Sequence, residues 1–239
     1  MPYNDSYSTA LVVVAHPDDA EFGFAGTIAK FCVDGMDVYY VMCTDGSHGT
    51  SDLEMPREEI ARIRHEEQRN ACRVLGAKDV VFLDHEDGYL QPTLELRKEI
   101  SREIRRFRPD VLICQNPART LDGRSYTGHP DHFAAGEAAL SAVFPSARDH
   151  LTFPELLEEG FEPHKTREVL ISGFSSPDVW IDVTDSIETA ILGAMEHKSQ
   201  IGDRTHEQMS QRLKEGRAQN AFGRGMKYAE TFKSFTYRM

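Results

Sequence analysis

A short apolar run near the start of the chain ends in a cluster of imidazole and carboxylate side chains. Leu11-Val12-Val13-Val14 is followed at once by Ala15-His16-Pro17-Asp18-Asp19-Ala20-Glu21. An apolar run of this length, bounded by polar residues, is typical of a buried strand. We therefore expect a buried strand to end by bringing one imidazole and two carboxylates to a single point.

A second cluster of the same kind lies more than a hundred residues later. Gly128-His129-Pro130-Asp131-His132 follows a long loop, and Pro130 suits the first turn of a helix, where its missing N–H costs little. Together the two clusters supply two histidines and an aspartate for a metal, plus a spare carboxylate and a spare imidazole. That combination is typical of a metal-dependent hydrolase.

Strand-like and helical segments alternate through the first part of the chain, which predicts βαβ units and a parallel sheet. We expect an α/β, Rossmann-like fold: a mostly parallel sheet flanked by helices, with a smaller C-terminal elaboration, in a single domain over residues 1–239. The expected strands are Leu11–Ala15, Asp37–Cys43, Val80–Leu83 and Val111–Cys114; the expected helices are Glu21–Asp34, Pro56–Leu75, Thr93–Phe107 and Pro130–Val143.

The C-terminal part has a looser pattern. We expect strands at Val169–Phe174 and Val179–Val183, antiparallel at a sheet edge, and helices at Asp185–Lys198 and Thr205–Asn220. Asp185 or Thr184 is the expected N-cap of the first of these helices.

Polar residues follow each of the first four expected strands. Ligands of doubly wound sheets bind beyond the carboxyl ends of the strands. We therefore expect one rim to carry the residues that follow these strands, namely His16, Asp19, Asp45, Asp87, His129 and His132.

The composition of the chain limits the classes of molecule that the protein is expected to bind. The formal net charge of -12 and the pI near 5.3 disfavour binding to nucleic acid or an anionic membrane. The four cysteines form no CxxC pair, which favours buried reduced thiols and a cytoplasmic location. No apolar stretch approaches the roughly 18 residues of a membrane span. We expect a small-molecule substrate, and a homo-oligomer stays open.

The metal ligands expected from the residues are His16, Asp19 and His132. Two imidazoles and one carboxylate suit zinc and leave room for water and substrate. Non-haem iron uses the same ligand types, so iron stays open. The alternative is that the first cluster only caps a helix, with His16 packed beside it.

The residues of the two clusters that are not expected to bind the metal suit roles in hydrolysis. Asp18 is the expected general base, or alternatively a carboxylate that orients His16. His129 is expected to stabilise an oxyanion or to protonate a leaving amine, with Asp131 fixing its tautomer. His129 as a further ligand, or as a purely structural residue, is the alternative.

The motifs together resemble the PIG-L/LmbE-like family of N-acetylglucosaminyl deacetylases. The matching pieces run in the family's order, and the two histidine clusters are the most specific of them. The others are Thr44-Asp45-Gly46, Arg64 with Glu67, Asp87-Gly88, the segment Ala194–Gln200 and Tyr228-Ala229-Glu230.

The resemblance implies a Rossmann-like fold, a divalent metal that is usually zinc, and hydrolysis of an acetamide on an amino sugar. It implies the same ligands and base, and it puts Arg64 and Asp87 at positions that contact the sugar. From the residues alone, the charges around Arg64 read as solvated and Asp87-Gly88 as a plain turn. The resemblance leaves open the roles of residues 145–167 and of His197.

We therefore expect an enzyme that removes an acetyl group from an N-acetylated sugar or related small molecule. A hydratase or another amidase on the same scaffold is one alternative. A nucleotide-binding Rossmann module without catalysis is another, although the first loop lacks GxGxxG and its carboxylates would repel a pyrophosphate. A metal-binding regulatory protein is the third, although it would need neither Asp18 nor His129.

Overall fold

The computed structural model describes residues 6–119, 121 and 127–237. The described residues form a seven-stranded sheet in the order β3-β2-β1-β4-β5-β7-β6. Strands β1 to β5 run parallel, and β7 is antiparallel to both β5 and β6. The expected mixed α/β fold with a mostly parallel sheet is confirmed. The strands are β1 (Thr9–Val14), β2 (Asp37–Thr44), β3 (Asp79–His85), β4 (Val111–Gln115), β5 (Glu168–Ser172), β6 (Val179–Asp182) and β7 (Ala229–Thr236).

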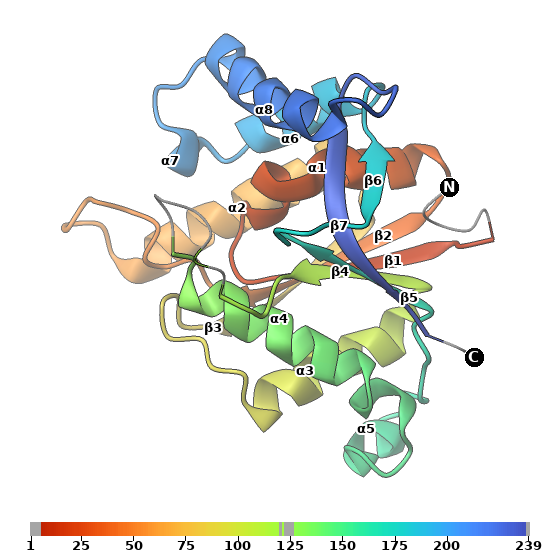
Figure 1. The fold of residues 1–239 in the computed structure, drawn as a ribbon. Helices are drawn as coiled ribbons and strands as arrows, with labels where there is room; N and C mark the ends of the chain where they lie inside the picture. Colours follow the sequence, from red (N-terminus) through yellow and green to blue (C-terminus); the bar gives the residue numbers. More distant parts are fainter. Residues whose placement is uncertain (1–5, 120, 122–126, 238–239) are drawn as a thin grey trace.

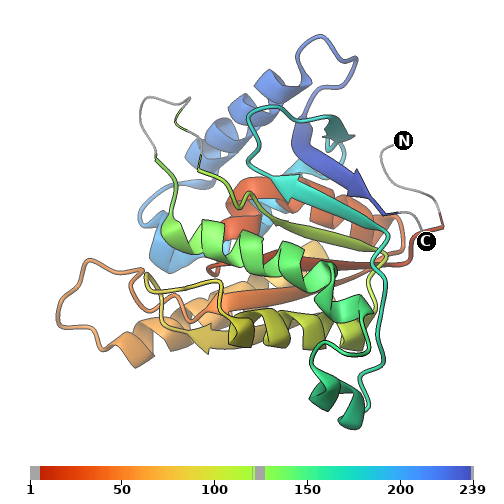
Figure 2. The ribbon, with the colours of Figure 1, turned by 60° about the horizontal axis from the view of Figure 1, so that its bottom comes forward.

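Helices cover both faces of the sheet (Figures 1 and 2). Helices α1, α2 and α6 pack on one face, and α3 and α4 pack on the other. Helix α8 packs on α6 and against β7. The helices are α1 (Asp19–Val33), α2 (Arg57–Leu75), α3 (Leu94–Phe107), α4 (Pro130–Val143), α5 (Pro154–Glu158), α6 (Ile187–Met195), α7 (Lys198–Ile201) and α8 (His206–Ala221), with a 3-10 turn at Ser146–Arg148.

The central strand β1 explains this arrangement. Its side chains alternate between the two faces: Val12 and Val14 enter the core beneath α1, whereas Leu11 and Val13 enter the core beneath α3 and α4. A strand covered on both faces is apolar throughout, as the run Leu11–Val14 is. Its carboxyl end is also covered, so only the residues after Val14 can reach a ligand.

The edge of the sheet differs from the expectation. Glu168–Ser172 pairs in parallel with β4 and is not at the edge, so the expected antiparallel edge is wrong on that side of the strand, whereas Val179–Asp182 is an antiparallel edge strand as expected. The last strand, β7, inserts between the two and pairs antiparallel with both. The β7 sequence contains the charged residues Glu230 and Lys233 and lacks a continuous apolar run, so its pattern gave no strand prediction. The N-cap of α6 is Ser186, not Asp185 or Thr184.

None of the helices in the described part of the chain has both the length and the apolar composition that crossing a membrane requires. All four cysteines are free thiols; Cys43, Cys72 and Cys114 are buried and Cys32 is half-buried, as expected of reduced packing residues.

The segment between α6 and α7 is anchored by a buried ion pair. His197 Nε2 lies 3.2 Å from Glu21 Oε2 on α1, and neither side chain is exposed to solvent. Burial works to lower the pKa of His197, but the hydrogen bond to Glu21 and the surrounding negative charges outweigh it, so the pKa is raised. The pair therefore holds the C-terminal elaboration against α1.

This pair predicts a pH-dependent stability. Because the pKa of His197 is raised on folding, its contribution is fully present below the unfolded pKa of about 6.5 and is lost as the pH rises through the folded pKa. We expect the stability advantage of the metal-free wild type over His197→Gln to shrink between about pH 6 and about pH 9. Urea unfolding at both pH values measures it, and an advantage independent of pH would contradict the prediction.

Helix α4 approaches β4 so closely that it tolerates only glycine at one position. A Cβ on Gly136 would lie 2.3 Å from the backbone oxygen of Gln115. We expect Gly136→Ala to destabilise the fold by about 1–3 kcal/mol, because the helix must shift away from the sheet. Gly216→Ala on α8 is the control: no heavy atom lies within 4 Å of its added Cβ. It should be neutral or stabilising by up to about 1 kcal/mol, and equal losses in both variants would refute the steric explanation.

Candidate metal centre and active site

The two histidine clusters meet beyond the carboxyl ends of β1 and β4. His16 follows β1, Asp19 begins α1, and His132 lies in the first turn of α4. His16 Nδ1 lies 3.3 Å from Asp19 Oδ2 and 3.2 Å from His132 Nε2. Asp19 Oδ1 is 3.0 Å from His132 Nε2. The structure therefore brings the three predicted ligands together.

The spacing of these three side chains suits a metal. Nitrogen and oxygen ligands at about 2.0–2.2 Å from a tetrahedral zinc stand roughly 3.3 Å apart, which the observed distances approach. Two imidazoles and a carboxylate are also ligands that zinc and iron both accept. The residues present thus fit a divalent metal.

Other side chains in the cluster also come within reach of one ion. Ligand atoms of His16, His129 and His132 lie within 4.8 Å of one another, and so do those of His16, Asp87, His129 and Asp131. The alternative that His129 is itself a ligand therefore stays open.

The far side of the His16 ring faces two carboxylates. His16 Nε2 lies 3.0 Å from Asp87 Oδ1 and 3.1 Å from Asp131 Oδ2. Metal-binding histidines usually give their second ring nitrogen to a carboxylate, which fixes the ring orientation and raises its basicity. Burial would lower the pKa of His16, but its hydrogen bonds to Asp131, Asp19 and Asp87 raise it to about 12. Without metal, a proton on His16 holds the acidic cluster together.

Asp87 and Asp131 are themselves fixed by backbone donors. Asp87 Oδ2 accepts the N–H of His48, and Asp131 Oδ2 accepts the N–H of Gly88 at 2.7 Å. Burial opposes ionisation of Asp87, yet its hydrogen bond and charge interaction with His16 hold its pKa at about 2. Both carboxylates therefore stay ionised and oriented toward His16.

His129 caps α4 with its own side chain. Its Nδ1 accepts the backbone N–H of Asp131 at 3.2 Å, whereas Asp131 Oδ1 lies 4.0 Å away. A neutral ring that accepts at Nδ1 carries its proton on Nε2. The backbone of α4, more directly than the Asp131 carboxylate, sets the tautomer of His129.

Asp18 lies beside the ligands in an unusual backbone conformation, with φ 102° and ψ −22°. A non-glycine residue in such a region stores about 1–3 kcal/mol of strain and is found most often at functional sites. Burial raises the pKa of Asp18 to about 6, against the opposing charge of Arg64. Its Oδ2 lies 3.3 Å from the guanidinium of Arg64.

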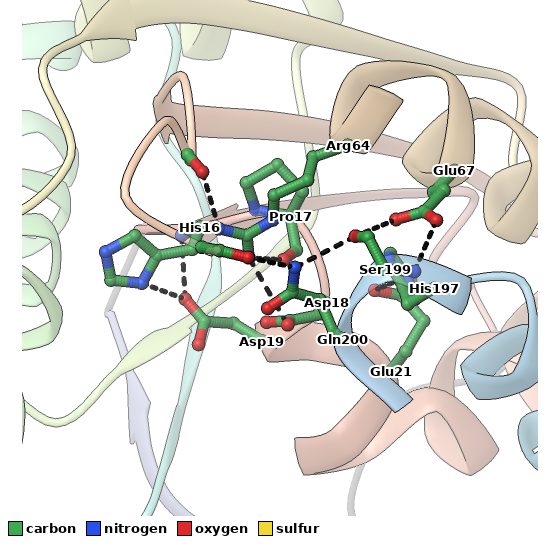
Figure 3. Close-up of polar contacts among 12 residues, drawn as sticks. His16, Pro17, Asp18, Asp19, Glu21, Arg64, Glu67, His197, Ser199 and Gln200 are labelled. Atoms are coloured by element: carbon green, nitrogen blue, oxygen red, sulfur yellow. Dashed lines mark hydrogen bonds and ion pairs between the residues drawn. The ribbon is translucent and has the colours of Figure 1, made fainter. Parts of the chain in front are cut away.

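Arg64 is buried rather than solvated, so reading it as a surface charge of α2 is wrong. The side chain is 4% exposed and donates to the carbonyl oxygens of Gly46 and Pro17. It also lies 3.6 Å from Asp87 Oδ2. Arg64 thus ties the loop after β2 to the turn that carries Asp18 (Figure 3).

A cleft opens from the metal ligands toward the C-terminal elaboration. Its volume is about 640 Å³, within the range of small-molecule sites. Asp19, His129 and His132 form its inner end, and Gln219 and Asn220 of α8 form part of its outer wall. The cleft therefore joins the two histidine clusters to a region that the motifs did not describe.

Two polar residues of the site, Gln115 and Gln68, belong to none of the motifs. Gln115 Oε1 accepts the N–H of Ala15 at 2.9 Å and so holds the end of β1. Gln68, Glu21 and His197 form a buried hydrogen-bonded chain behind Asp18. Glu21 and His197 lie within motifs that gave them no role, and Gln115 is a polar residue at the end of an otherwise apolar strand.

Comparisons with known proteins give the family. Residues 11–143 match the PIG-L family, described as GlcNAc-PI de-N-acetylase. The diacetylchitobiose deacetylase of Thermococcus kodakarensis is 35% identical over 200 residues, which cover 84% of this chain and 72% of that protein.

Two solved structures resemble the fold. The N,N'-diacetylchitobiose deacetylase of Pyrococcus horikoshii, solved with an inhibitor, superposes with a TM-score of 0.87 at 28% identity, over 97% of this chain and 85% of its own. The 4-carboxy-2-hydroxymuconate hydratase of Pseudomonas putida superposes with a TM-score of 0.78 at 21% identity, over 97% and 98%. The hydratase shows only that the fold is shared. The family match and the Thermococcus relative, together with the convergent histidine clusters, establish that this chain belongs to the PIG-L family.

Proposed function

We propose that this protein is a zinc-dependent deacetylase that hydrolyses the acetamide of an N-acetylated amino sugar or a related small molecule. One observation carries the proposal: His16, Asp19 and His132 converge within 3.3 Å beside the strained carboxylate of Asp18. The similarity to diacetylchitobiose deacetylases supports the substrate class.

His16, Asp19 and His132 would hold the metal. A divalent ion bound there would polarise the amide carbonyl and make a water molecule a stronger nucleophile at neutral pH. Zinc suits two imidazoles and a carboxylate, and iron is the other ion these ligands accept. Asp87 and Asp131 would hold the His16 ring in its ligating orientation.

Asp18 would act as the general base. Its carboxylate lies next to the ligand Asp19, and it would take a proton from the attacking water. Arg64 contacts one of its oxygens and keeps the side chain in place. After attack, the protonated Asp18 would return the proton to the departing amine, giving acetate and a free amine.

His129 would stabilise the oxyanion that forms on the carbonyl oxygen. Its Nδ1 is occupied by the backbone N–H of Asp131, so the Nε2–H is the group left to donate. The ring is 38% exposed and lines the cleft, where a substrate can reach it. His129 is also the alternative donor of the proton to the leaving amine.

Direct contact of Arg64 and Asp87 with the sugar stays a prediction. Both side chains are buried, and their described contacts are with protein groups. The geometry favours their holding Asp18 and His16 in place. The outer wall of the cleft, at Gln219 and Asn220, offers polar groups for the rest of the substrate.

The experiment that tests this function measures acetate release. Metal-stripped protein and protein given back zinc are assayed with N-acetylglucosamine and several of its glycosides. We expect release only with zinc. Asp18→Asn should bind zinc as the wild type does, yet lose at least about 10²-fold in kcat, because the amide cannot take the proton.

The exposed Asp203→Asn variant serves as the control and should keep wild-type activity. Wild-type rates in Asp18→Asn, or release that does not depend on metal, would contradict the proposal. Zinc binding without acetate release from any substrate would redirect the search to hydration reactions or other amides.

A further inference from the structure

The position of the Asp18 carboxylate depends on an unusual backbone turn. Asp18 has a φ of 102°, and the direction of its Cβ follows from this angle. An aspartate does not hold such a conformation unaided, since its surroundings must offset the strain. The groups that touch the backbone of Asp18 are therefore candidates for positioning the base.

Gln68 on α2 makes that contact. The N–H of Asp18 donates to Gln68 Oε1 at 3.1 Å, and Gln68 Nε2 donates to Glu21 Oε1 at 3.1 Å. Because a backbone N–H only donates and a carboxylate only accepts, these two neighbours fix the orientation of the Gln68 amide. Gln68 is fully buried, and other residues line the cleft.

Glu21 is in turn held by two further groups. It accepts a hydrogen bond from the hydroxyl of Tyr40 at 3.0 Å and pairs with His197 Nε2 at 3.2 Å. A buried carboxylate is tolerated only when it is paired and hydrogen-bonded in this way. The chain of contacts thus runs from His197 through Glu21 and Gln68 to the backbone of Asp18.

The next turn of the chain fixes α2 itself. The backbone N–H and the hydroxyl of Ser199 each donate to the carboxylate of Glu67 at 2.7 Å. Gln200 Nε2 donates to the carbonyl oxygen of Gly49. The segment 197–200 therefore holds α2, the helix that carries Gln68, in place through Glu67.

We propose that Gln68, oriented by Glu21 and His197, is a positioning residue that holds the backbone of Asp18 in its strained turn and so aims the Asp18 carboxylate at the attacking water. This inference rests on the proposed role of Asp18 as the base. It gives the segment around His197 a function: His197 holds Glu21, which in turn orients the amide of Gln68.

The test replaces Gln68 by methionine, which keeps the length of the side chain but cannot accept the N–H of Asp18. We expect Gln68→Met to lose about 10²-fold in kcat, the scale of a misplaced catalytic group, with KM within about twofold. Bound zinc should stay equal to the wild type. Amide hydrogen exchange at Asp18 should become at least about tenfold faster, because its N–H loses its partner.

A matched control separates positioning from loss of stability. Ile60→Val removes one buried methyl group from the same helix, away from the hydrogen-bonded chain. It should lower the melting temperature without changing kcat or the exchange at Asp18. A loss of kcat in Ile60→Val that matches the loss in Gln68→Met would overturn the proposal.

The double variant Glu21→Gln/Gln68→Glu exchanges the two side chains and preserves their net charge. It keeps an oxygen facing the N–H of Asp18, so its kcat should lie within about tenfold of the wild type. If Gln68→Met keeps wild-type kcat, or if exchange at Asp18 is unchanged, Gln68 does not position the base.

The exchange measurement also separates this inference from the proposed function. A wild type that releases no acetate refutes the deacetylase. Slow exchange at Asp18 in the wild type and fast exchange in Gln68→Met would still show that Gln68 holds the turn. Equal exchange in the two proteins would refute the positioning role whatever the activity.

Discussion

The two ring nitrogens of His16 face two different groups of side chains, and this division organises the site. Nδ1 faces Asp19 and His132, whereas Nε2 faces Asp87 and Asp131. A ring held from one side by two ionised carboxylates presents a basic, oriented nitrogen on the other. In the metal-free protein the same carboxylates favour a proton on His16. Metal binding must displace that proton, so affinity should fall in acid.

The fold supplies this arrangement by bringing three separate segments to one edge of the sheet. His16 and Asp19 come from the turn between β1 and α1, Asp87 from the loop after β3, and Asp131 with His132 from the first turn of α4. The parallel strand order places these turns side by side. The C-terminal elaboration contributes behind the site, through His197, and in front of it, through the outer wall of the cleft.

The local patterns predicted the parallel part of the fold and the convergence of the predicted ligands, because both depend on short motifs at strand ends. They did not predict β7 or the parallel pairing of β5, since the direction of strand pairing depends on partners that are distant in the sequence. They also missed Gln68, whose role depends on one hydrogen bond to a residue fifty positions away. The burial of Arg64 was not predicted either, because charged residues on helices usually face solvent.

The central claim is that metal binds on the Nδ1 side of His16, opposite Asp87 and Asp131. Anomalous diffraction at the zinc absorption edge, on crystals of the zinc-loaded protein, tests it most directly. We expect one strong peak within bonding distance of His16 Nδ1, Asp19 and His132. A peak on the Nε2 side of His16, bonded to Asp87 and Asp131, would contradict it, as would zinc bound only away from His16.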